Sequence, residues 1–294
     1  MYLPASVKDI LLPGQRPILD QLARGRSLLA FDYDGVLAPV ITDPGGAPMR
    51  PGTRRLLARL ARVWPSAVVS GRAWTHTRRL TEGAVPLIVG NHGYELGRER
   101  PVPRAVLDRV RAWRAALERE LAGVPGVYFE DKRSTLAIHY GLERRWRAVA
   151  GAVHRAATRL QGARLVHGKK VLNVIPAGFP NKGDAVRALL AKLRLDTALY
   201  VGDDVTDEDA FALGLPLVVG VRVGSGRSRA PFRLASQDRI EELLGLLLRL
   251  RADSRSRRSE MEPRPSTGSG RAGGTGSGRA GGTGSGRAAG IRSR

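Results

Sequence analysis

The chain has 294 residues, 42% of them hydrophobic, which is enough to build one large or two modest domains around a real core. It contains no cysteine, so disulfides, thiolate chemistry and cysteine-based zinc sites are excluded. The formal net charge of +22 either attracts anions, such as phosphorylated metabolites, nucleic acid or anionic lipid, or reflects arginine-rich helix faces in solvent.

The sequence shows no sign of a membrane segment or a secretory leader. We find no charged segment followed by an apolar segment and a cleavage site, and no apolar run of the roughly 18 residues that would cross a bilayer. We therefore expect a cytoplasmic protein without membrane contact, and we expect it to be a monomer.

The first part of the chain alternates short apolar runs with turns. Runs over residues 28–31, 67–69 and 86–89 suit buried parallel strands, and each run ends in a polar or glycine-rich turn. An amphipathic helix follows the first of them. This rhythm predicts one half of a doubly wound α/β sheet over residues 26–97. We interpret residues 1–25 as an N-terminal extension.

The rhythm changes over residues 98–177, where long amphipathic helices alternate with pairs of strands. This pattern is typical of an α+β unit, and we interpret it as an inserted cap domain. The expected elements are helices over residues 106–121 and 146–160 and strands over residues 127–130, 134–140, 164–167 and 171–175.

The first pattern returns over residues 178–250. Asn181 can cap a helix, strands over residues 198–201 and 217–221 follow, and a helix over residues 240–250 closes the unit. The predicted fold class is therefore α/β, with a doubly wound, mostly parallel Rossmann-like core and an inserted α+β cap.

Residues 251–294 differ from the rest in composition. They are rich in Arg, Ser, Gly and Thr, and from Thr267 an eight-residue unit without large apolar side chains repeats three times. Ordering such a unit costs entropy that no packing recovers, so we predict a disordered tail rather than a solenoid. Ten arginines against three acidic residues give the tail a charge of +7 and leave +15 on the other 250 residues. Weak nucleic-acid contact by the tail is an alternative, although no aromatic residue offers a stacking platform.

Polar clusters stand at the ends of the predicted core strands. In open α/β sheets these strand ends share one edge, where ligands bind. Carboxylates gathered there repel one another unless a cation lies among them, and hard oxygen ligands suit Mg²⁺. A lysine, a serine and backbone N–H groups suit phosphate oxygens. The residues expected to converge are Asp32, Asp34, Ser70, Gly71, Lys182, Asp203, Asp204 and Asp207, with Arg72 in the same turn as Ser70.

Such a cluster can transfer a phosphoryl group. Asp32 can attack phosphorus and form an aspartyl-phosphate, and Asp34 can protonate the leaving oxygen and then activate the hydrolytic water. Lys182 can offset charge on the transferring group. Phosphate monoesters need acceleration of up to about 10²¹-fold, which requires all of these groups together.

Each motif alone also has an ordinary structural explanation. Asp-x-Asp-Gly and Gly-Asp-Asp are turn and helix-cap sequences, and Ser-Gly-Arg is a common turn. A lysine at a helix start is mildly opposed by the helix dipole. The joint occurrence of these motifs at successive strand ends favours the phosphoryl-transfer interpretation.

The chain resembles the trehalose-6-phosphate phosphatases, a family of haloacid-dehalogenase-like enzymes with a mixed α/β cap. The resemblance covers about residues 26–250 and lies in the segments FDYDGVLAPV, VVSGR, GNHGYE, EDKRSTLAIHY, NKGDAVRALL and YVGDDVTDEDAF. The Asp-x-Asp-Gly, Lys and Gly-Asp-Asp motifs are shared across the superfamily. The His-Gly-x-Glu, Asp-Lys…His-Tyr and Thr-Asp-Glu-Asp-x-Phe stretches are more particular to this family.

The resemblance implies a role for each matching residue, with Mg²⁺ as cofactor and a sugar phosphate as substrate. It makes Asp32 the nucleophile and a metal ligand, and it makes Asp34 the acid and base, with its backbone carbonyl on the metal. Ser70, Gly71 and Lys182 bind phosphate, and Asp203 is a metal ligand supported by Asp204 or Asp207. The residues that fall at sugar-facing positions are His92, Glu95, Lys132, His139 and Asn173.

Three positions depart from the family pattern. Val36 stands where the family usually has Thr, Gly141 where it commonly has Arg, and Asn173 where a sugar-binding glutamate is expected. Trehalose 6-phosphate is therefore the first expectation, and another glycosyl phosphate, such as glucosylglycerol phosphate or sucrose phosphate, is the alternative. A non-catalytic sugar-phosphate sensor is a third reading, opposed by the intact Asp32 and Lys182.

Overall fold

The computed structural model describes residues 8–41, 45–140, 146–168 and 170–261, and it contains two β-sheets. An eight-stranded sheet has the order β1-β12-β11-β10-β2-β3-β4-β5 and is parallel except for its edge strand β5. Its central strands are continuous apolar runs because helices cover both faces. The strands are β1 (Lys8–Asp9), β2 (Ser27–Phe31), β3 (Ser66–Val69), β4 (Leu87–Gly90), β5 (Glu95–Leu96), β10 (Thr197–Gly202), β11 (Val218–Val223) and β12 (Phe232–Leu234).

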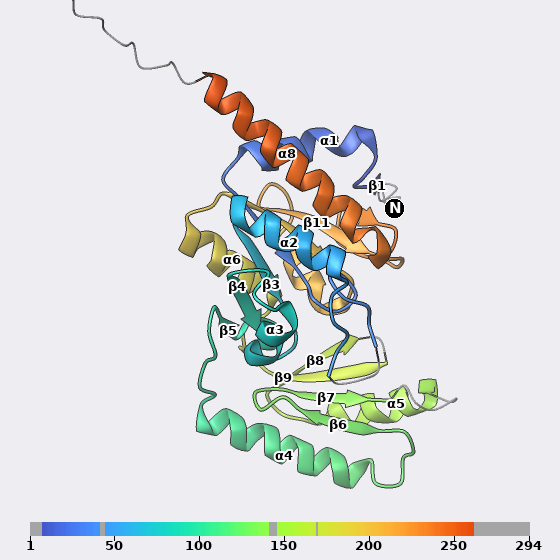
Figure 1. The fold of residues 1–294 in the computed structure, drawn as a ribbon. Coiled ribbons are helices and arrows are strands. Elements are labelled where there is room, and N and C mark those ends of the chain that lie inside the picture. Colours follow the sequence, from blue (N-terminus) through green and yellow to red (C-terminus); the bar gives the residue numbers. More distant parts are fainter. Residues whose placement is uncertain (1–7, 42–44, 141–145, 169, 262–294) are drawn as a thin grey trace, which may run out of the picture.

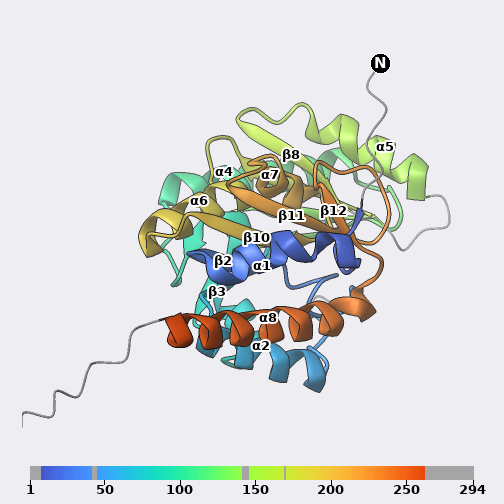
Figure 2. The same cartoon turned by 90° about the horizontal axis from the view of Figure 1, so that it is seen from above.

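Helices cover the two faces of this sheet with separate apolar clusters. On one face lie α1 (Arg16–Arg24), α2 (Pro51–Val63) and α8 (Ile240–Met261), which bury leucines against alternate side chains of β2. On the other face lie α6 (Lys182–Leu193) and the short α7 (Glu208–Phe211). Figure 2 shows α2 and α8 on the side of the sheet opposite α6 and α7. Helix α3 (Trp74–Thr81) packs beside β4.

A second sheet lies beyond the carboxyl ends of the core strands (Figure 1). It is antiparallel, with the order β6-β7-β9-β8, and its apolar face packs on two helices. Its elements are α4 (Arg104–Glu120), β6 (Tyr128–Asp131), β7 (Leu136–His139), α5 (Trp146–Ala157), β8 (Ala163–Gly168) and β9 (Val171–Pro176). The two sheets together confirm the predicted fold class, a mostly parallel α/β core with a separate α+β unit.

The two segments that connect the units touch each other. The ring of Tyr94 stacks on that of Phe179, with 4.5 Å between the ring centroids, and the Tyr94 hydroxyl donates to the carbonyl of Pro101. The guanidinium of Arg100 lies 4.7 Å from the centroid of the same tyrosine ring. The chain therefore leaves and re-enters the core at one place.

The interpretation of residues 1–25 as an extension outside the core is wrong for the part that the structure describes. Strand β1 pairs in parallel with β12, and α1 buries Leu19, Leu22 and Ala23 in the main core cluster. The sequence pattern hid this role because α1 packs on α8, more than 200 residues away along the chain.

The closing helix is also longer than predicted, since α8 continues past residue 250 to Met261. The Arg251 guanidinium donates to the carbonyls of Ala23 and Val63 at 2.6 and 3.2 Å and lies over the ring of Trp64. These contacts extend the helix into arginine-rich sequence. The remaining tail, residues 262–294, and Gly141 lie outside the described residues. Among the described residues, no helix has the length and apolarity to span a bilayer.

Candidate active site

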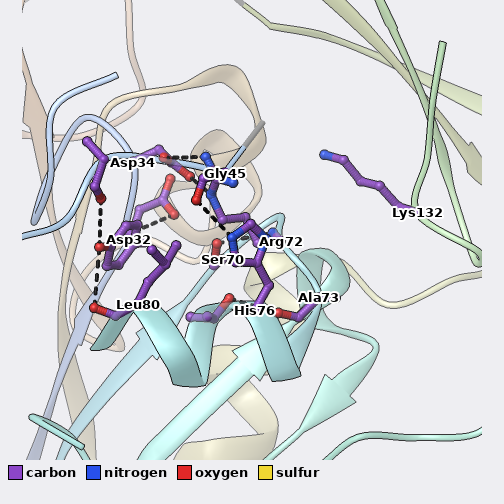
Figure 3. Close-up of polar contacts among 12 residues, drawn as sticks. Asp32, Asp34, Gly45, Ser70, Arg72, Ala73, His76, Leu80 and Lys132 are labelled. Carbon is purple, nitrogen blue, oxygen red and sulfur yellow. Dashed lines mark hydrogen bonds and ion pairs between the residues drawn. The ribbon is translucent and has the colours of Figure 1, made fainter. Parts of the chain in front are cut away.

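The predicted site residues come together at the carboxyl edge of the main sheet. Asp32 follows β2 directly, Ser70 follows β3, and Asp203 follows β10, and these strands pair in the order β10-β2-β3. Lys182 opens α6, whose start is fixed by a capping box between Asn181 and Asp184. Figure 3 shows Asp32, Asp34 and Ser70 grouped at this edge, with Lys132 pointing in from the second sheet.

The centre of the site is a buried lysine between two carboxylates. The Lys182 ammonium lies 2.7 Å from Asp32 Oδ2 and 2.8 Å from Asp207 Oδ1, and its side chain is 2% exposed. Burial lowers the pKa of Lys182, but the carboxylates of Asp207 and Asp32 outweigh it and hold the pKa above its ordinary value. The ammonium is therefore a permanent positive charge beside Asp32.

Opposing effects act on the pKa of the Asp32 carboxyl group. Burial raises its pKa well above the ordinary value, and the neighbouring charges of Asp207 and Asp203 push in the same direction, against Lys182. Its Oδ1 accepts a hydrogen bond from the backbone N–H of Tyr33 at 2.7 Å, which fixes the carboxyl orientation. A nucleophilic carboxylate here needs more positive charge than Lys182 alone supplies.

Asp207 holds Lys182 and the turn after β10 in place through hydrogen bonds. Its Oδ1 accepts from Lys182 and from the hydroxyl of Tyr200 at 2.7 Å, and its Oδ2 accepts from the backbone N–H groups of Asp203 and Asp204, each at 2.9 Å. The prediction made Asp207 a supporting metal ligand. Both of its oxygens accept hydrogen bonds that position Lys182 and the 203–204 turn, and its support of a metal stays a prediction.

Oxygen atoms of Asp32, Asp203 and Asp207 lie within 4.8 Å of one another, close enough to share one ion. Burial and the charges of Asp207 and Asp204 raise the pKa of Asp203 to about 7. A Cβ on Gly35 would lie 2.1 Å from an Asp203 carboxylate oxygen, so only glycine allows the loop after Asp34 to approach this carboxylate. The donor set of hard oxygens around a like-charge cluster fits Mg²⁺.

Asp204 is placed apart from the three clustered carboxylates. Its side chain caps the 3₁₀ turn Val205–Asp207 through a capping box with Asp207. A Cβ on Gly168 at the end of β8 would lie 3.1 Å from its carboxylate, so Asp204 faces the second sheet. Asp204 therefore caps this turn at the junction of the two units, and its support of a metal stays a prediction.

Asp34 pairs with an arginine that sequence reasoning had assigned no role. Arg72 Nε lies 2.7 Å from Asp34 Oδ2 and its Nη2 lies 2.9 Å from Oδ1, a bidentate pair that is partly buried. The signal for this residue was present in the turn of residues 70–72, directly after a strand. The sequence does not show which carboxylate Arg72 pairs with, because that depends on how the chain folds.

A buried histidine from the turn after β4 packs on the turn after β3. A Cβ on Gly71 would lie 2.5 Å from the His92 ring, so the imidazole packs directly on this turn. His92 has a left-handed backbone (φ 58°), and among the described residues neither of its ring nitrogens has a hydrogen-bond partner. Burial lowers the pKa of His92 well below its ordinary value, and Lys132, Lys182 and Arg164 add to the effect. The ring is therefore a neutral polar group held between the two units.

We expect His92 to make the fold acid-sensitive. Its folded pKa lies below the unfolded value of 6.5, so its contribution to stability is complete above pH 6.5 and is lost as pH falls toward the folded pKa. Relative to His92→Asn, whose asparagine tolerates the left-handed backbone, wild type should lose about 1.4 kcal/mol of unfolding free energy between about pH 7.5 and 5.5. Urea unfolding at both pH values measures this difference.

The control for this comparison is Gln161→Asn, an exposed substitution that changes no titratable group and should follow wild type at both pH values. Equal pH dependence of wild type and His92→Asn would show that burial does not lower the pKa of the His92 imidazole.

Glu95 has an internal partner rather than an open carboxylate. Its Oε2 accepts the backbone N–H of Trp74 at 2.7 Å, at the start of α3, and the side chain is 4% exposed. The sequence placed Glu95 among sugar-facing residues. In the structure it holds the turn between β3 and α3, and its contact with a sugar stays a prediction.

The second sheet presents a group of polar side chains toward the core. Glu130 Oε2 lies 2.9 Å from His139 Nε2 and 3.8 Å from Lys132 Nζ. Burial lowers the pKa of Lys132, and Arg72 and Lys182 add to this while Glu130 and Asp34 oppose it. Lys132 is thus within electrostatic reach of both its own sheet and the core site. Glu130 belongs to this group, although the sequence had assigned it no role.

Asn173 lies in β9, opposite Ala137 and Val166. Its side chain is buried, and its amide donates a long hydrogen bond of 3.5 Å to the carbonyl of Val166. A second contact joins the two units nearby, because Arg164 of β8 pairs with Asp209 of α7 at 3.2 Å. The same sheet that carries Asn173 is therefore held against the core.

Comparisons with known proteins agree with this arrangement. The chain is 31% identical over 233 residues to "Probable trehalose-phosphate phosphatase 9" of Oryza sativa subsp. japonica, covering 67% of this chain and 62% of that protein. It is 31% identical over 260 residues to the "Trehalose-phosphate phosphatase" of Mycobacterium ulcerans (strain Agy99), covering 83% and 66%. The matched part is less than two thirds of the length of either relative.

Solved structures share the fold at lower identity. The C-terminal domain of the C. albicans trehalose-6-phosphate phosphatase superposes with a TM-score of 0.70 at 23% identity, covering 84% of this chain and 99% of that one. The sucrose-phosphatase of Synechocystis sp. PCC6803 superposes with a TM-score of 0.52 at 16% identity, covering 76% and 98%. The model of the trehalose-phosphatase family matches residues 30–238, and the chain belongs to this family.

Proposed function

We propose that this protein is a Mg²⁺-dependent phosphatase that hydrolyses trehalose 6-phosphate through an aspartyl-phosphate on Asp32. The observation that carries the proposal is the buried Lys182, which bridges Asp32 and Asp207 beside the carboxylate of Asp203. Two carboxylates and a lysine with so little exposure are costly to bury without a function that uses their charges. The relatives with trehalose-phosphate phosphatase names support the choice of reaction.

The chemistry proceeds in two balanced steps. A carboxylate oxygen of Asp32 attacks phosphorus while the bond from phosphorus to the sugar oxygen breaks, and Asp34 gives that oxygen a proton. Asp34 then takes a proton from water, whose oxygen attacks phosphorus and releases phosphate from Asp32. Lys182 and the turn at Ser70 and Gly71 hold the phosphoryl oxygens, and Arg72 keeps the Asp34 carboxyl in one orientation.

Asp32, Asp203 and the backbone carbonyl of Asp34 would hold the Mg²⁺. When bound, the ion offsets charge on the phosphoryl oxygens and favours the ionised forms of the carboxylates around it. The pKa values of Asp32 and Asp203 are raised, so both carboxylates need a nearby cation to stay ionised, and the bound ion would be that cation.

Residues 98–177 act in this proposal as a cap that recognises the sugar. Glu130, Lys132 and His139 form a connected polar group on the side of the cap sheet that faces the core site, and the buried His92 lies on the core side. Hydroxyl groups of a sugar can meet both donors and acceptors there. The unpartnered ring nitrogens of His92 are suited to such a contact.

Asn173 is the reason to test the sugar directly. A neutral amide replaces the charge of the glutamate expected at this position, and charge-assisted hydrogen bonds are the stronger kind. We expect phosphate release to give the highest kcat/KM for trehalose 6-phosphate in a panel that includes sucrose phosphate and glucosylglycerol phosphate. A higher value for another sugar phosphate would overturn the substrate assignment and leave the phosphatase assignment in place.

The same assay separates an enzyme from a sensor. EDTA should abolish phosphate release, and added Mg²⁺ should restore it. Binding of trehalose 6-phosphate without phosphate release in the presence of Mg²⁺ would contradict catalysis altogether.

A further inference from the structure

A cavity of about 360 Å³ opens at the amino edge of the main sheet, the edge opposite the candidate active site. Its wall is made by the connections that lead into three core strands and by one residue of α8. Strand β2 begins at this cavity with Ser27 and ends beside Asp32, and β10 begins next to Asp196 and ends beside Asp203. Figure 1 shows the second sheet at one end of the molecule and α1 and α8 toward the other. The cavity is therefore separate from the site described above.

The charge of this wall is strongly positive. Arg24, Arg26 and Arg251 line the cavity, and the single acidic residue in its lining is Asp196. Among the described residues, neither the Arg24 nor the Arg26 guanidinium has a hydrogen-bond or ion-pair partner. Many other arginines of the fold pair with a carboxylate, as Arg72 does with Asp34. Arg24 and Arg26 are both exposed residues in the lining of this cavity, and they bring unmatched positive charge to it.

The rest of the wall is held firmly. Ser27 donates its hydroxyl to the carbonyl of Leu22 at 2.7 Å and accepts the indole N–H of Trp64 at 3.0 Å. The backbone N–H of Asp196 donates to the carbonyl of Arg26 at 2.8 Å, which ties the connections before β2 and β10 together. Arg251 is fixed by the carbonyls and the Trp64 ring described above. Because the rest of the wall is fixed, the ordering cost of binding is limited to the side chains of the two arginines.

We propose that this cavity binds a phosphorylated small molecule. Guanidinium groups form bidentate hydrogen bonds with phosphate oxygens, and three arginines against one aspartate leave an excess charge that a phosphate monoester of about −1.5 to −2 balances. The cavity volume lies at the small end of the roughly 300–1,000 Å³ range of ligand pockets, which favours a small molecule over a polymer. Strands β2 and β10 run from this cavity to the catalytic edge, where Asp32 and Asp203 follow them. The bound anion would therefore lie at the amino ends of the same two strands.

Calorimetric titration with inorganic pyrophosphate tests the proposal on the full chain in EDTA, where the carboxylates of the other site repel an anion. We expect at least tenfold weaker binding to Arg24→Ala/Arg26→Ala than to wild type. The matched control is Arg55→Ala/Arg59→Ala, which removes the same charge from the exposed face of α2 and should leave binding within twofold. An equal loss in both variants, or no loss in either, would overturn the proposal.

Asp196 allows a test in the opposite direction. Asp196→Asn removes the one negative charge from the wall and should tighten pyrophosphate binding about threefold, whereas unchanged or weaker binding would count against the site. Titration with a single-stranded oligonucleotide tests whether the cavity binds a nucleic acid instead of a small molecule. If Arg24→Ala/Arg26→Ala weakens oligonucleotide binding more than it weakens pyrophosphate binding, the cavity is part of a nucleic-acid surface and the small-molecule assignment is wrong.

Discussion

Asp32→Asn should lower kcat by at least about 10⁴-fold, because the amide cannot attack phosphorus and loss of a nucleophile removes the whole covalent route. We expect the fold to survive, since asparagine has nearly the same volume and its carbonyl oxygen can still accept the N–H of Tyr33. Lys182 also keeps its contact with Asp207. The unfolding free energy should stay within about 2 kcal/mol of wild type. Steady-state phosphate release and urea unfolding measure both quantities.

The matched control is Asp108→Asn, which removes one carboxylate from the exposed surface of α4 and should leave kcat unchanged. Turnover of Asp32→Asn near the wild-type rate would remove Asp32 as the nucleophile. If Asp32→Asn does not fold, Asp32→Glu takes its place in the assay. Its carboxylate is displaced from the position of the Asp32 carboxylate, so this variant should also be inactive.

Lys182→Met should damage stability and activity together. It leaves the carboxylates of Asp32 and Asp207 buried without their shared cation, and breaking a buried pair in this way costs about 3–5 kcal/mol. We expect kcat to fall by about 10²–10³-fold, the usual range for loss of one group that stabilises transition-state charge. Added Mg²⁺ should recover part of the lost stability, because it offsets the same carboxylates.

Lys192→Met serves as the control, since Lys192 is exposed near the end of the same helix and should tolerate the change. If Lys182→Met unfolded at the same urea concentration as Lys192→Met, the lysine would not be what compensates the buried carboxylates, and the electrostatic description of the site would be wrong.

Most of the core could be predicted from the sequence because buried parallel strands are short, continuous apolar runs. Strands β2, β3, β4 and β10 were found in this way, each within about one or two residues of its observed bounds. Several elements were missed, among them α3, β12, α1 and the end of α8. Helix α1 and the end of α8 are stabilised by each other across the chain, and local periodicity cannot show a partner that far away.

The convergence of the site could be predicted for a related reason. Parallel strands end at one edge, so Asp32, Ser70 and Asp203 had to meet there, and the structure places Lys182 against Asp32 as expected. The finer roles could not be predicted. Asp207 accepts four hydrogen bonds, and only the folded arrangement of Tyr200 and the turn after β10 makes this visible.

The same limit applies to the side chains around the proposed sugar site. A sequence shows that Arg72 and Glu95 are charged, but not that Arg72 meets Asp34 or that Glu95 accepts the N–H of Trp74. Such pairings depend on side-chain directions set by loops, which have no periodic pattern. The departure at Asn173 was visible in the sequence, whereas its burial within the cap sheet was not.

Trapping of the phosphorylated enzyme would show whether Asp32 is the nucleophile. Wild-type protein mixed with trehalose 6-phosphate and Mg²⁺, quenched in acid within one turnover and analysed by peptide mass spectrometry should carry a phosphoryl group on Asp32. Asp32→Asn treated in the same way should carry none. Phosphate release by wild type with no phosphorylated peptide, or with the phosphoryl group on another residue, would contradict the account.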